Sequence, residues 1–189
     1  MKHTPKIKKA IQFAARRHHG QFRKETELLP YITHPFSVAL LVAESGGGED
    51  AVIAALLHDT IEDTETTAEE IALQFGESIA VLVGALSEEL SKETSWRMRK
   101  EAYLRALGEA SDDAVLVAIA DKIDNIESKL EALENEGPEL FKRWAQPPHS
   151  YLWYHGASLE IAEKRLPKHP LTKRLAEAHK RERDMLGGL

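Results

Sequence analysis

The chain has 189 residues, and its 25 basic and 31 acidic side chains give a formal net charge of −6. Proteins that bind nucleic-acid backbones non-specifically carry an excess of basic residues, so this composition argues against a nucleic-acid polymer as partner. Hydrophobic residues make up 42% of the chain and charged residues 30%, which indicates a folded protein rather than a disordered one. For this length we expect one domain over residues 1–189, in which residues 166–189 form a closing C-terminal helix.

The sequence contains no cysteine, which excludes disulfide bonds, thiolate metal sites and a cysteine nucleophile. Nine histidines remain as candidate nitrogen ligands. No apolar run approaches the ~20 residues that span a bilayer. The basic N-terminal segment has no apolar core of the kind found in signal peptides. We therefore expect no membrane partner and a cytoplasmic location.

Helical periodicity recurs along nearly the whole chain. The first helix is predicted after an N-cap at Thr4, and Gly20 closes it. A polar loop over 21–33 precedes a second helix, which Pro35 opens and three consecutive glycines end. Residues 139–149 are expected to be irregular, and no alternating strand pattern is present, so we predict an all-α helical bundle. The other helices are predicted over 50–58, 67–76, 78–86, 95–110, 114–133, 150–165 and 171–185.

Charged side chains are concentrated at the end of the third predicted helix. His58, Asp59, Glu62 and Asp63 lie within the six positions that directly follow the apolar stretch 51–57. If helical geometry persists there, His58 and Glu62 lie one turn apart, and so do Asp59 and Asp63. So much charge beside a buried face costs free energy unless a cation neutralises it. A divalent metal ion would do so.

Two distant segments contain further candidate metal ligands. Asp121 begins a polar stripe on a helix that is otherwise apolar, where an unpaired carboxylate is rarely found. His34 precedes Pro35, whose restricted backbone holds the histidine at the mouth of the second helix. Together with His58 and Asp59, these residues supply two imidazoles and two carboxylates. A donor set of nitrogen and oxygen without sulfur suits Mn, Fe or Mg with open water positions better than a closed structural zinc.

A divalent ion held by this donor set is coherent with metal-assisted hydrolysis, for example of a phosphate ester. A divalent ion acidifies water and polarises a phosphoryl oxygen. Glu62 or Asp63 would add general-base catalysis of roughly 10²- to 10⁴-fold. Basic side chains must then hold the remaining phosphates in an otherwise acidic protein. The candidates for this clamp are Arg23, Lys24, Arg97, Arg99 and Lys100.

The sequence resembles the hydrolase domain of the RelA/SpoT alarmone enzymes, which is an HD-domain metal-dependent phosphohydrolase. The resemblance extends roughly over residues 5–165, in order, and the single-domain small alarmone hydrolases are the most similar in length. Its motifs are specific in combination, although a bare His-Asp pair means nothing. The motifs are HxGQxRK at 18–24, PYIxHP at 30–35, AALLHDTIEDT at 54–64, FG at 75–76 and ADKIxN at 120–125.

The resemblance implies an all-α HD-type fold, a Mn²⁺ ion, and removal of pyrophosphate from the ribose 3′ position of (p)ppGpp to give GDP or GTP. It implies that the acid pair Glu62 and Asp63 orients and deprotonates the attacking water. The metal ligands that it implies are His34, His58, Asp59 and Asp121. The substrate contacts that it implies are Arg23 at the guanine, Lys24 at phosphate, and Asn125 with Ser128 at the nucleoside. Lys100, and more weakly Tyr151, are further candidate contacts with the nucleotide.

Three other interpretations remain open. The segment 24–30 is longer than in the alarmone enzymes, lacks their glycine and adds two acids, which leaves base recognition uncertain and allows another 2′- or 3′-phosphate nucleotide as substrate. A non-catalytic alarmone-binding module is disfavoured, because such relatives lose metal ligands or the acid pair. His58, Asp59 and Asp121 could instead form a buried ion-pair network with Lys122 or arginine partners. The sequence leaves open whether the chain forms a homo-oligomer.

Overall fold

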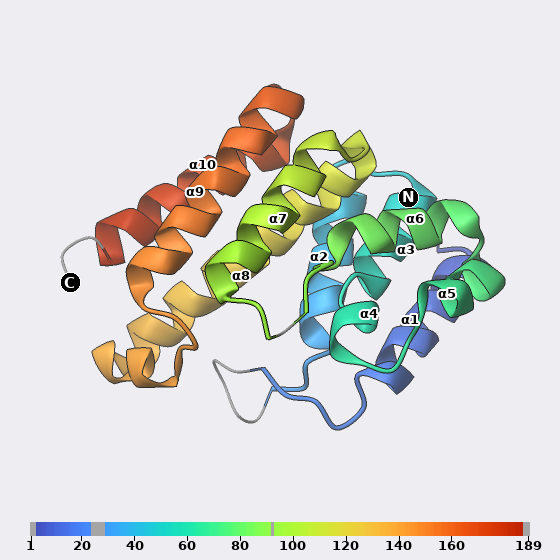
Figure 1. Cartoon of the computed structure of the whole chain (residues 1–189), viewed down its shortest axis with the longest axis horizontal. Helices are drawn as coiled ribbons and strands as arrows, with labels where there is room; N and C mark the ends of the chain where they lie inside the picture. The colour runs from blue at the N-terminus through green and yellow to red at the C-terminus, as the bar shows by residue number, and fades with distance from the viewer. Residues whose placement is uncertain (1–2, 24–28, 92, 187–189) are drawn as a thin grey trace.

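The structure, a computed structural model, describes residues 3–23, 29–91 and 93–186. These residues form ten α-helices and one 3₁₀ helix (Figure 1), which confirms the predicted all-α fold. Phe22 and Pro30 form an isolated antiparallel bridge between the first two helices. The helices are α1 (Pro5–Arg17), α2 (Thr33–Glu44), α3 (Glu49–Leu57), α4 (Thr60–Asp63), α5 (Ala68–Phe75), α6 (Glu77–Leu86), α7 (Trp96–Glu109), α8 (Asp112–Glu136), η1 (Pro138–Arg143), α9 (Pro148–Arg165) and α10 (Pro170–Leu186).

Side-chain caps fix the N-termini of several helices where the sequence predicts them. The Thr4 hydroxyl accepts a hydrogen bond from the backbone N–H of Ile7, and the Ser111 hydroxyl accepts one from Ala114. Thr67 caps α5 in the same way. Each cap satisfies an N–H group that has no partner within its own helix, so these residues begin helices rather than continue them.

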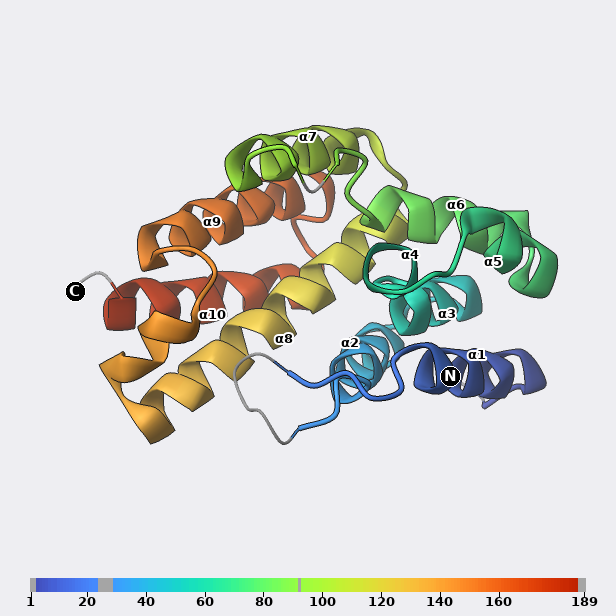
Figure 2. The ribbon, with the colours of Figure 1, turned by 60° about the horizontal axis from the view of Figure 1, so that its bottom comes forward.

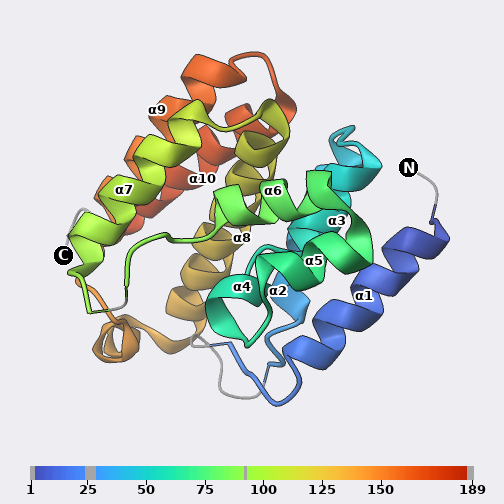
Figure 3. The ribbon, with the colours of Figure 1, turned by 45° about the vertical axis from the view of Figure 1, so that its right-hand side comes forward.

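Helix α8 crosses the middle of the molecule. Figure 2 shows α1 to α6 on one side of it and α7, α9 and α10 on the other. It contacts α2, α3 and α6 in the first group and α9 and α10 in the second. Its N-terminal half is buried on most sides, as its apolar sequence predicts. The two groups therefore share one core around α8, and Figure 3 shows them separated on either side of the molecule.

Helix α3 is enclosed by α1, α2, α6 and α8. Every residue from Ala51 to Leu57 is buried, so the helix presents no polar face. Truncation of Leu57 to Ala is expected to cost about 2–5 kcal/mol, because a buried methyl cluster would be replaced by a cavity. This packing fixes the C-terminal end of α3, where His58 and Asp59 follow.

Three segments differ from the sequence-based prediction. Helix α2 begins at Thr33, so His34 lies inside its first turn rather than ahead of it; the Thr33 hydroxyl donates to the Pro30 carbonyl (2.8 Å) and Ile32 is already in the helical region. Residues 138–143 form a 3₁₀ helix where irregular chain was predicted. The last helix begins at Pro170 and not at 166, because Leu166 ends α9. No helix in the described ranges is long and apolar enough to cross a membrane.

Candidate active site

A cavity of about 610 Å³ lies between the two groups of helices. One end is lined by histidines and acids: His34, His58, Asp59, Glu62, Asp63 and Asp121. The other walls are rich in cations and aromatic rings: Arg23, Arg99, Lys100, Lys122, Lys129, Arg143, Tyr31, Trp96, Tyr103, Trp144, Tyr151 and Tyr154. A concave site with converging charged groups of both signs is the usual form of an active site.

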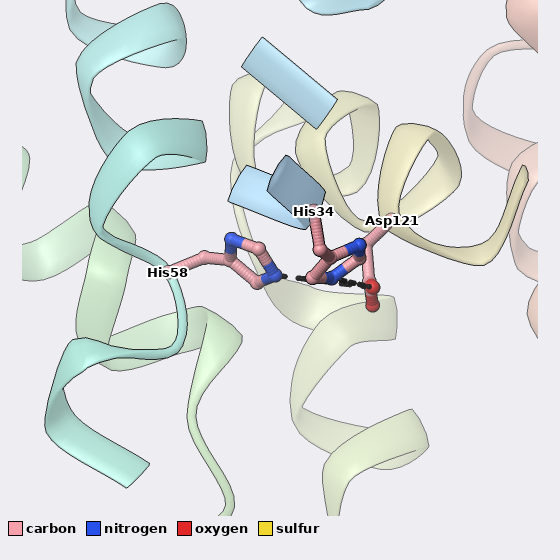
Figure 4. Close-up of side chains that lie close together, drawn as sticks. All are labelled: His34, His58 and Asp121. Carbon is pink, nitrogen blue, oxygen red and sulfur yellow. Dashed lines mark ion pairs between the residues drawn. The ribbon is translucent and has the colours of Figure 1, made fainter. Parts of the chain in front are cut away.

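His34, His58 and Asp121 converge from three helices that are far apart in the sequence (Figure 4). One potential ligand atom from each residue lies within 4.8 Å of the other two. Asp121 Oδ1 is 3.2 Å from His34 Nε2 and 3.8 Å from His58 Nε2. The three side chains are buried or nearly so, which is unusual for a cluster of polar groups without a shared partner.

Asp59 completes the set of four predicted ligands. Its Oδ2 atom lies 3.0 Å from His58 Nε2 and 3.6 Å from His34 Nε2, and it accepts a hydrogen bond from the Tyr31 hydroxyl (2.6 Å). Burial alone would raise the pKa of Asp59, but the neighbouring His58 outweighs it and lowers the pKa below its ordinary value. The cluster therefore contains an ionised carboxylate beside both imidazoles.

The two histidines are held with their Nε2 atoms toward this cluster. The Ala55 carbonyl, which can only accept, takes the Nδ1–H of His58 at 2.8 Å. The Nδ1 of His34 donates to Asp124 Oδ2 at 2.6 Å. His58 Nε2 is fully buried and has no well-aligned hydrogen-bond partner within the described part of the chain. Metal-binding histidines have this arrangement, because a bond at one ring nitrogen orients the other toward the ion.

The protonation of the cluster indicates an excess of negative charge. Burial alone would lower the pKa of His58, but the nearby Asp59 overcomes this and raises the pKa to about 9. The pKa of His34 is also raised, because the hydrogen bonds that its ring donates to Asp121 and Asp124 outweigh burial. The carboxylates stabilise positive charge on the two buried imidazoles. A divalent cation can supply that positive charge in place of the protons, so the donor set fits a metal ion.

Asp121 also takes part in an ion pair on α8. Its Oδ2 atom pairs with Lys122, and Asn125 donates to its Oδ1. The Lys122 ammonium lies between the rings of Tyr103 and Tyr154, 5.4 and 5.0 Å from their centroids. This pairing is the buried network that the sequence left open. The Lys122 pair accounts for one oxygen of Asp121, but not for the two imidazoles that approach the other oxygen and also approach Asp59.

The proposed catalytic pair lies in the one-turn helix α4, at the same end of the cavity. The backbone stays helical through His58 and Asp59, and the Asp63 N–H donates to the Asp59 carbonyl (2.9 Å). Asp59 and Asp63 are therefore one turn apart, as expected. Burial raises the pKa of Glu62, although Lys100 acts in the opposite direction. A carboxylate whose pKa is raised toward neutral pH is a better general base than a carboxylate of ordinary pKa.

The predicted substrate contacts have different outcomes. Arg23 and Asn125 line the cavity and hydrogen-bond to each other (3.4 Å). Lys100 and Tyr151 line it as well, whereas Lys24 falls outside the described residues. Ser128 is partly buried on α8 and does not belong to the cavity lining, so its role stays a prediction.

Arg97 does not face this cavity, in contrast to the predicted clamp. It is exposed, donates to Glu101 (2.7 Å) and stacks over Trp153. Arg99 and Lys100 line the cavity and both pair with Glu88, at 2.6 and 2.5 Å. Of the three α7 candidates for the phosphate clamp, only Arg99 and Lys100 therefore have a position that suits this role.

The sequence did not single out several residues of the site. Asp124 orients His34, and its position three residues after Asp121 was the available signal. Lys129, Arg143 and His155 line the far end of the cavity but belong to no recognisable motif. They reach the cavity only because α8, η1 and α9 pack around it.

A protein-family model described as an HD domain matches residues 10–146 of this chain. The chain therefore belongs to the HD domain family. Its relatives include proteins named guanosine-3′,5′-bis(diphosphate) 3′-pyrophosphohydrolase and one named GTP pyrophosphokinase. A guanosine-3′,5′-bis(diphosphate) 3′-pyrophosphohydrolase from Aquifex aeolicus is 40% identical over 128 residues, which are 67% of this chain but only 18% of that protein. Human MESH1, which has the same enzyme name, is 41% identical over 119 residues, 62% of this chain and 65% of its own length.

Solved structures resemble the whole fold. The structure of a metazoan ortholog of SpoT, described as hydrolysing ppGpp, superposes with a TM-score of 0.77 at 25% identity and covers 96% of this chain and 97% of that one. A crystal structure of the protein lmo0812 from Listeria monocytogenes gives a TM-score of 0.70 at 30% identity, with 78% and 96% covered. The first likeness extends beyond the matched HD region into α9 and α10.

Proposed function

We propose that this chain is a metal-dependent hydrolase that removes pyrophosphate from the ribose 3′ position of guanosine alarmones, converting ppGpp to GDP and pppGpp to GTP. The observation that carries the proposal is the convergence of His34, His58, Asp59 and Asp121 at one end of a cavity whose other walls are basic and aromatic. The enzyme names of the relatives agree with this chemistry.

The proposed cofactor is Mn²⁺, bound by His34, His58, Asp59 and Asp121. Two imidazole nitrogens and two carboxylate oxygens form a mixed donor set that suits this ion. When bound, such an ion polarises a phosphoryl oxygen and makes water more acidic. The substrate is a small nucleotide. A cytoplasmic location and the oligomeric state stay predictions.

The acid pair Glu62 and Asp63 is proposed to hold the attacking water and accept its proton. The water oxygen bonds to the phosphorus that is attached to ribose O3′, the bond from that phosphorus to O3′ breaks, and O3′ leaves with a proton. Tyr31 supports this end of the cavity, because its hydroxyl contacts Asp59 Oδ2 at 2.6 Å and Asp63 Oδ2 at 3.5 Å. General-base catalysis of this kind contributes about 10²- to 10⁴-fold.

The basic wall is proposed to hold the phosphates that do not react. Lys100 and Lys122 lie close to the acid end and flank the ring of Tyr154, at 4.9 and 5.0 Å from its centroid. Both have a pKa raised above the ordinary lysine value, because nearby acids and tyrosines outweigh burial, so they stay charged at neutral pH. Buried ammonium groups stabilise phosphate oxygens more strongly than exposed ones.

The test is turnover of defined nucleotides by the wild-type protein loaded with Mn²⁺. We expect GDP and pyrophosphate from ppGpp, no turnover after chelation, and recovery on addition of Mn²⁺. A variant with Glu62→Gln and Asp63→Asn should keep the metal and lose about 10²- to 10⁴-fold in kcat. Release of orthophosphate from another 2′- or 3′-phosphate nucleotide, with none from ppGpp, would replace the alarmone with that substrate. Binding of ppGpp without turnover would instead indicate a regulatory module.

A further inference from the structure

Helices α9 and α10 contain a buried hydrogen-bonded cluster, formed by His155, His179 and Glu182, that lies outside the region matched by the HD family model. Glu182 Oε1 accepts from His155 Nδ1 at 2.7 Å, and its Oε2 accepts from His179 Nδ1 at 3.0 Å. One carboxylate of α10 therefore binds two imidazoles, one from its own helix and one from α9.

The packing around this cluster is close. Gly156 follows His155 on α9, and a Cβ atom at that position would lie 3.2 Å from His179 Nε2. The glycine therefore allows α10 to approach α9 closely enough for Glu182 to reach His155. Burial alone would raise the pKa of Glu182, but the hydrogen bonds from the two histidines lower it to about 2. The carboxylate is thus ionised and accepts from both rings.

His155 also lines the substrate cavity. Its ring lies beside those of Tyr151 and Tyr154, with centroid distances of 6.3 and 5.8 Å. Burial lowers the pKa of His155, and Lys129 and Lys122 act in the same direction, although Glu182 opposes them. Because Nδ1 donates to Glu182, the neutral ring has its lone pair on Nε2, which acts as a hydrogen-bond acceptor.

An acceptor ring nitrogen differs from the cations and the indole nitrogen that line this part of the cavity. Lys129 and Arg143 donate hydrogen bonds and cannot accept them, and the indole of Trp144 is a donor as well. Donors bind phosphate oxygens without distinguishing one nucleoside from another. A neutral imidazole nitrogen pairs instead with an N–H or O–H group, which phosphates lack at neutral pH and nucleosides have.

We propose that His155 accepts a hydrogen bond from the nucleoside of the bound nucleotide, and that Glu182 and His179 are positioning residues that hold its ring for this contact. The donor is a base N–H or a ribose hydroxyl. This inference rests on the proposed function, since it assumes that the cavity binds a guanosine nucleotide. It adds a specificity-determining residue from a part of the chain that the HD family model does not match.

Two substitutions of His155 separate the contact with the substrate from the contact with Glu182. In His155→Asn the amide nitrogen replaces Nδ1 and keeps the bond to Glu182, whereas the acceptor is lost. In His155→Gln the amide oxygen replaces Nε2 as acceptor, whereas the bond to Glu182 is lost. We expect His155→Asn to weaken GDP binding about three- to tenfold, and His155→Gln, which keeps the acceptor without the bond to Glu182, to weaken it less.

The measurement is calorimetric binding of GDP, inosine diphosphate and 2′-deoxy-GDP to each variant. If the donor is the guanine amino group, His155→Asn lowers affinity for GDP but not for inosine diphosphate. If the donor is the 2′-hydroxyl, His155→Asn lowers the affinity for GDP but binds 2′-deoxy-GDP as tightly as the wild type does. An equal loss for all three ligands assigns the contact to another nucleoside donor. Unchanged GDP binding by His155→Asn, or no GDP binding by the wild type, would overturn the proposal.

Glu182→Gln tests the positioning role. In ¹⁵N spectra of the histidine side chains, wild-type His155 should show a protonated Nδ1 and an unprotonated Nε2, and Nε2 should shift when GDP binds. The variant should lose this pattern and show a raised KM with kcat unchanged. A wild-type ring without an Nδ1 proton contradicts the inference. If wild type binds GDP with the expected shift but does not hydrolyse ppGpp, the proposed function fails while this contact stands.

Discussion

Both ends of the cavity contain histidine rings that are oriented by a hydrogen bond at Nδ1, but the groups around these rings differ. At the acid end, His58 donates from Nδ1 to the Ala55 carbonyl and His34 donates from Nδ1 to Asp124, so the Nε2 atoms of both rings lie toward carboxylates. At the far end, His155 donates from Nδ1 to Glu182, and its ring lies among lysines and aromatic rings. An imidazole fixed among acids favours a cation, whereas one fixed among cations stays neutral and accepts a hydrogen bond. The surroundings of the ring therefore decide its role.

The largest expected effect is the loss of metal binding and activity when a carboxylate of the acid end is neutralised. Asp59→Asn keeps the size of the side chain but removes its charge, so we expect Mn²⁺ binding to be lost and ppGpp hydrolysis to fall by more than about 10³-fold. Metal content of the purified variant and its kcat/KM are the measurements. Asp113→Asn, at an exposed position in the first turn of α8, is the control and should retain both. Full activity of Asp59→Asn would remove this residue from the site.

A smaller effect on Mn²⁺ affinity is expected when the hydrogen bond that orients His34 is weakened. Asp124→Asn weakens the bond that orients His34, so Mn²⁺ affinity should fall about 10- to 100-fold while the fold is kept. Glu127→Gln is a matched control on the same helix, because Glu127 pairs with Arg174. A metal titration of both variants checks the prediction. Equal affinities in the two variants would show that Asp124 does not act through His34.

The third prediction compares the effect on KM of substituting two basic residues of α7, one that lines the cavity and one that does not. Lys100→Met removes a cation from the cavity and should raise KM for ppGpp about tenfold or more. Arg97→Gln should leave KM within about twofold, because Arg97 is exposed and pairs with Glu101 outside the cavity. Steady-state kinetics of the two variants decide this. The reverse order of effects would contradict the placement of α7.

The last prediction concerns the free energy of unfolding and the buried cluster at the far end. Glu182 has a pKa of about 2 in the folded protein, below its value in the unfolded chain, so its contribution is present above about pH 5 and is lost as the pH falls toward 2. The pKa of His155 is also lowered, so protonation below about pH 6.5 destabilises the fold in the same direction. The full contribution of Glu182 is about 3 kcal/mol.

This pH dependence is measured by urea unfolding of metal-free protein between pH 7 and 4. Glu182→Gln should unfold more easily at pH 7 and lose less stability than wild type on acidification. The exposed Glu177→Gln, on the same helix, is the control and should behave as wild type. Parallel curves for wild type and Glu182→Gln would show that the buried carboxylate does not carry the effect.

The acid end could be predicted from the sequence because its residues occupy short contiguous motifs. His58 and Asp59 directly follow a run of buried residues, and Asp121 interrupts another, so their charge stands out against apolar neighbours. Helical periodicity and caps gave the fold class and most helix positions. The 3₁₀ helix at 138–143 was missed, since a six-residue helix is too short to show a hydrophobic period.

The far end could not be predicted, because its residues meet only through tertiary packing. His155 and Glu182 are 27 positions apart on different helices, and each alone resembles an ordinary polar residue. Arg97 was placed in the clamp because spacing along α7 does not show which face turns toward the cavity. Knowing that α9 packs against α7 and α8 was necessary to separate Arg97 from Lys100.

The central claim is that four side chains bind one divalent ion, and pulsed electron paramagnetic resonance of Mn²⁺-loaded protein tests it most directly. The account predicts one bound Mn²⁺ per chain with nitrogen couplings from two imidazoles, one of which disappears in His34→Gln and the other in His58→Gln. A bound ion without imidazole coupling, or no bound ion at stoichiometric Mn²⁺, would contradict it.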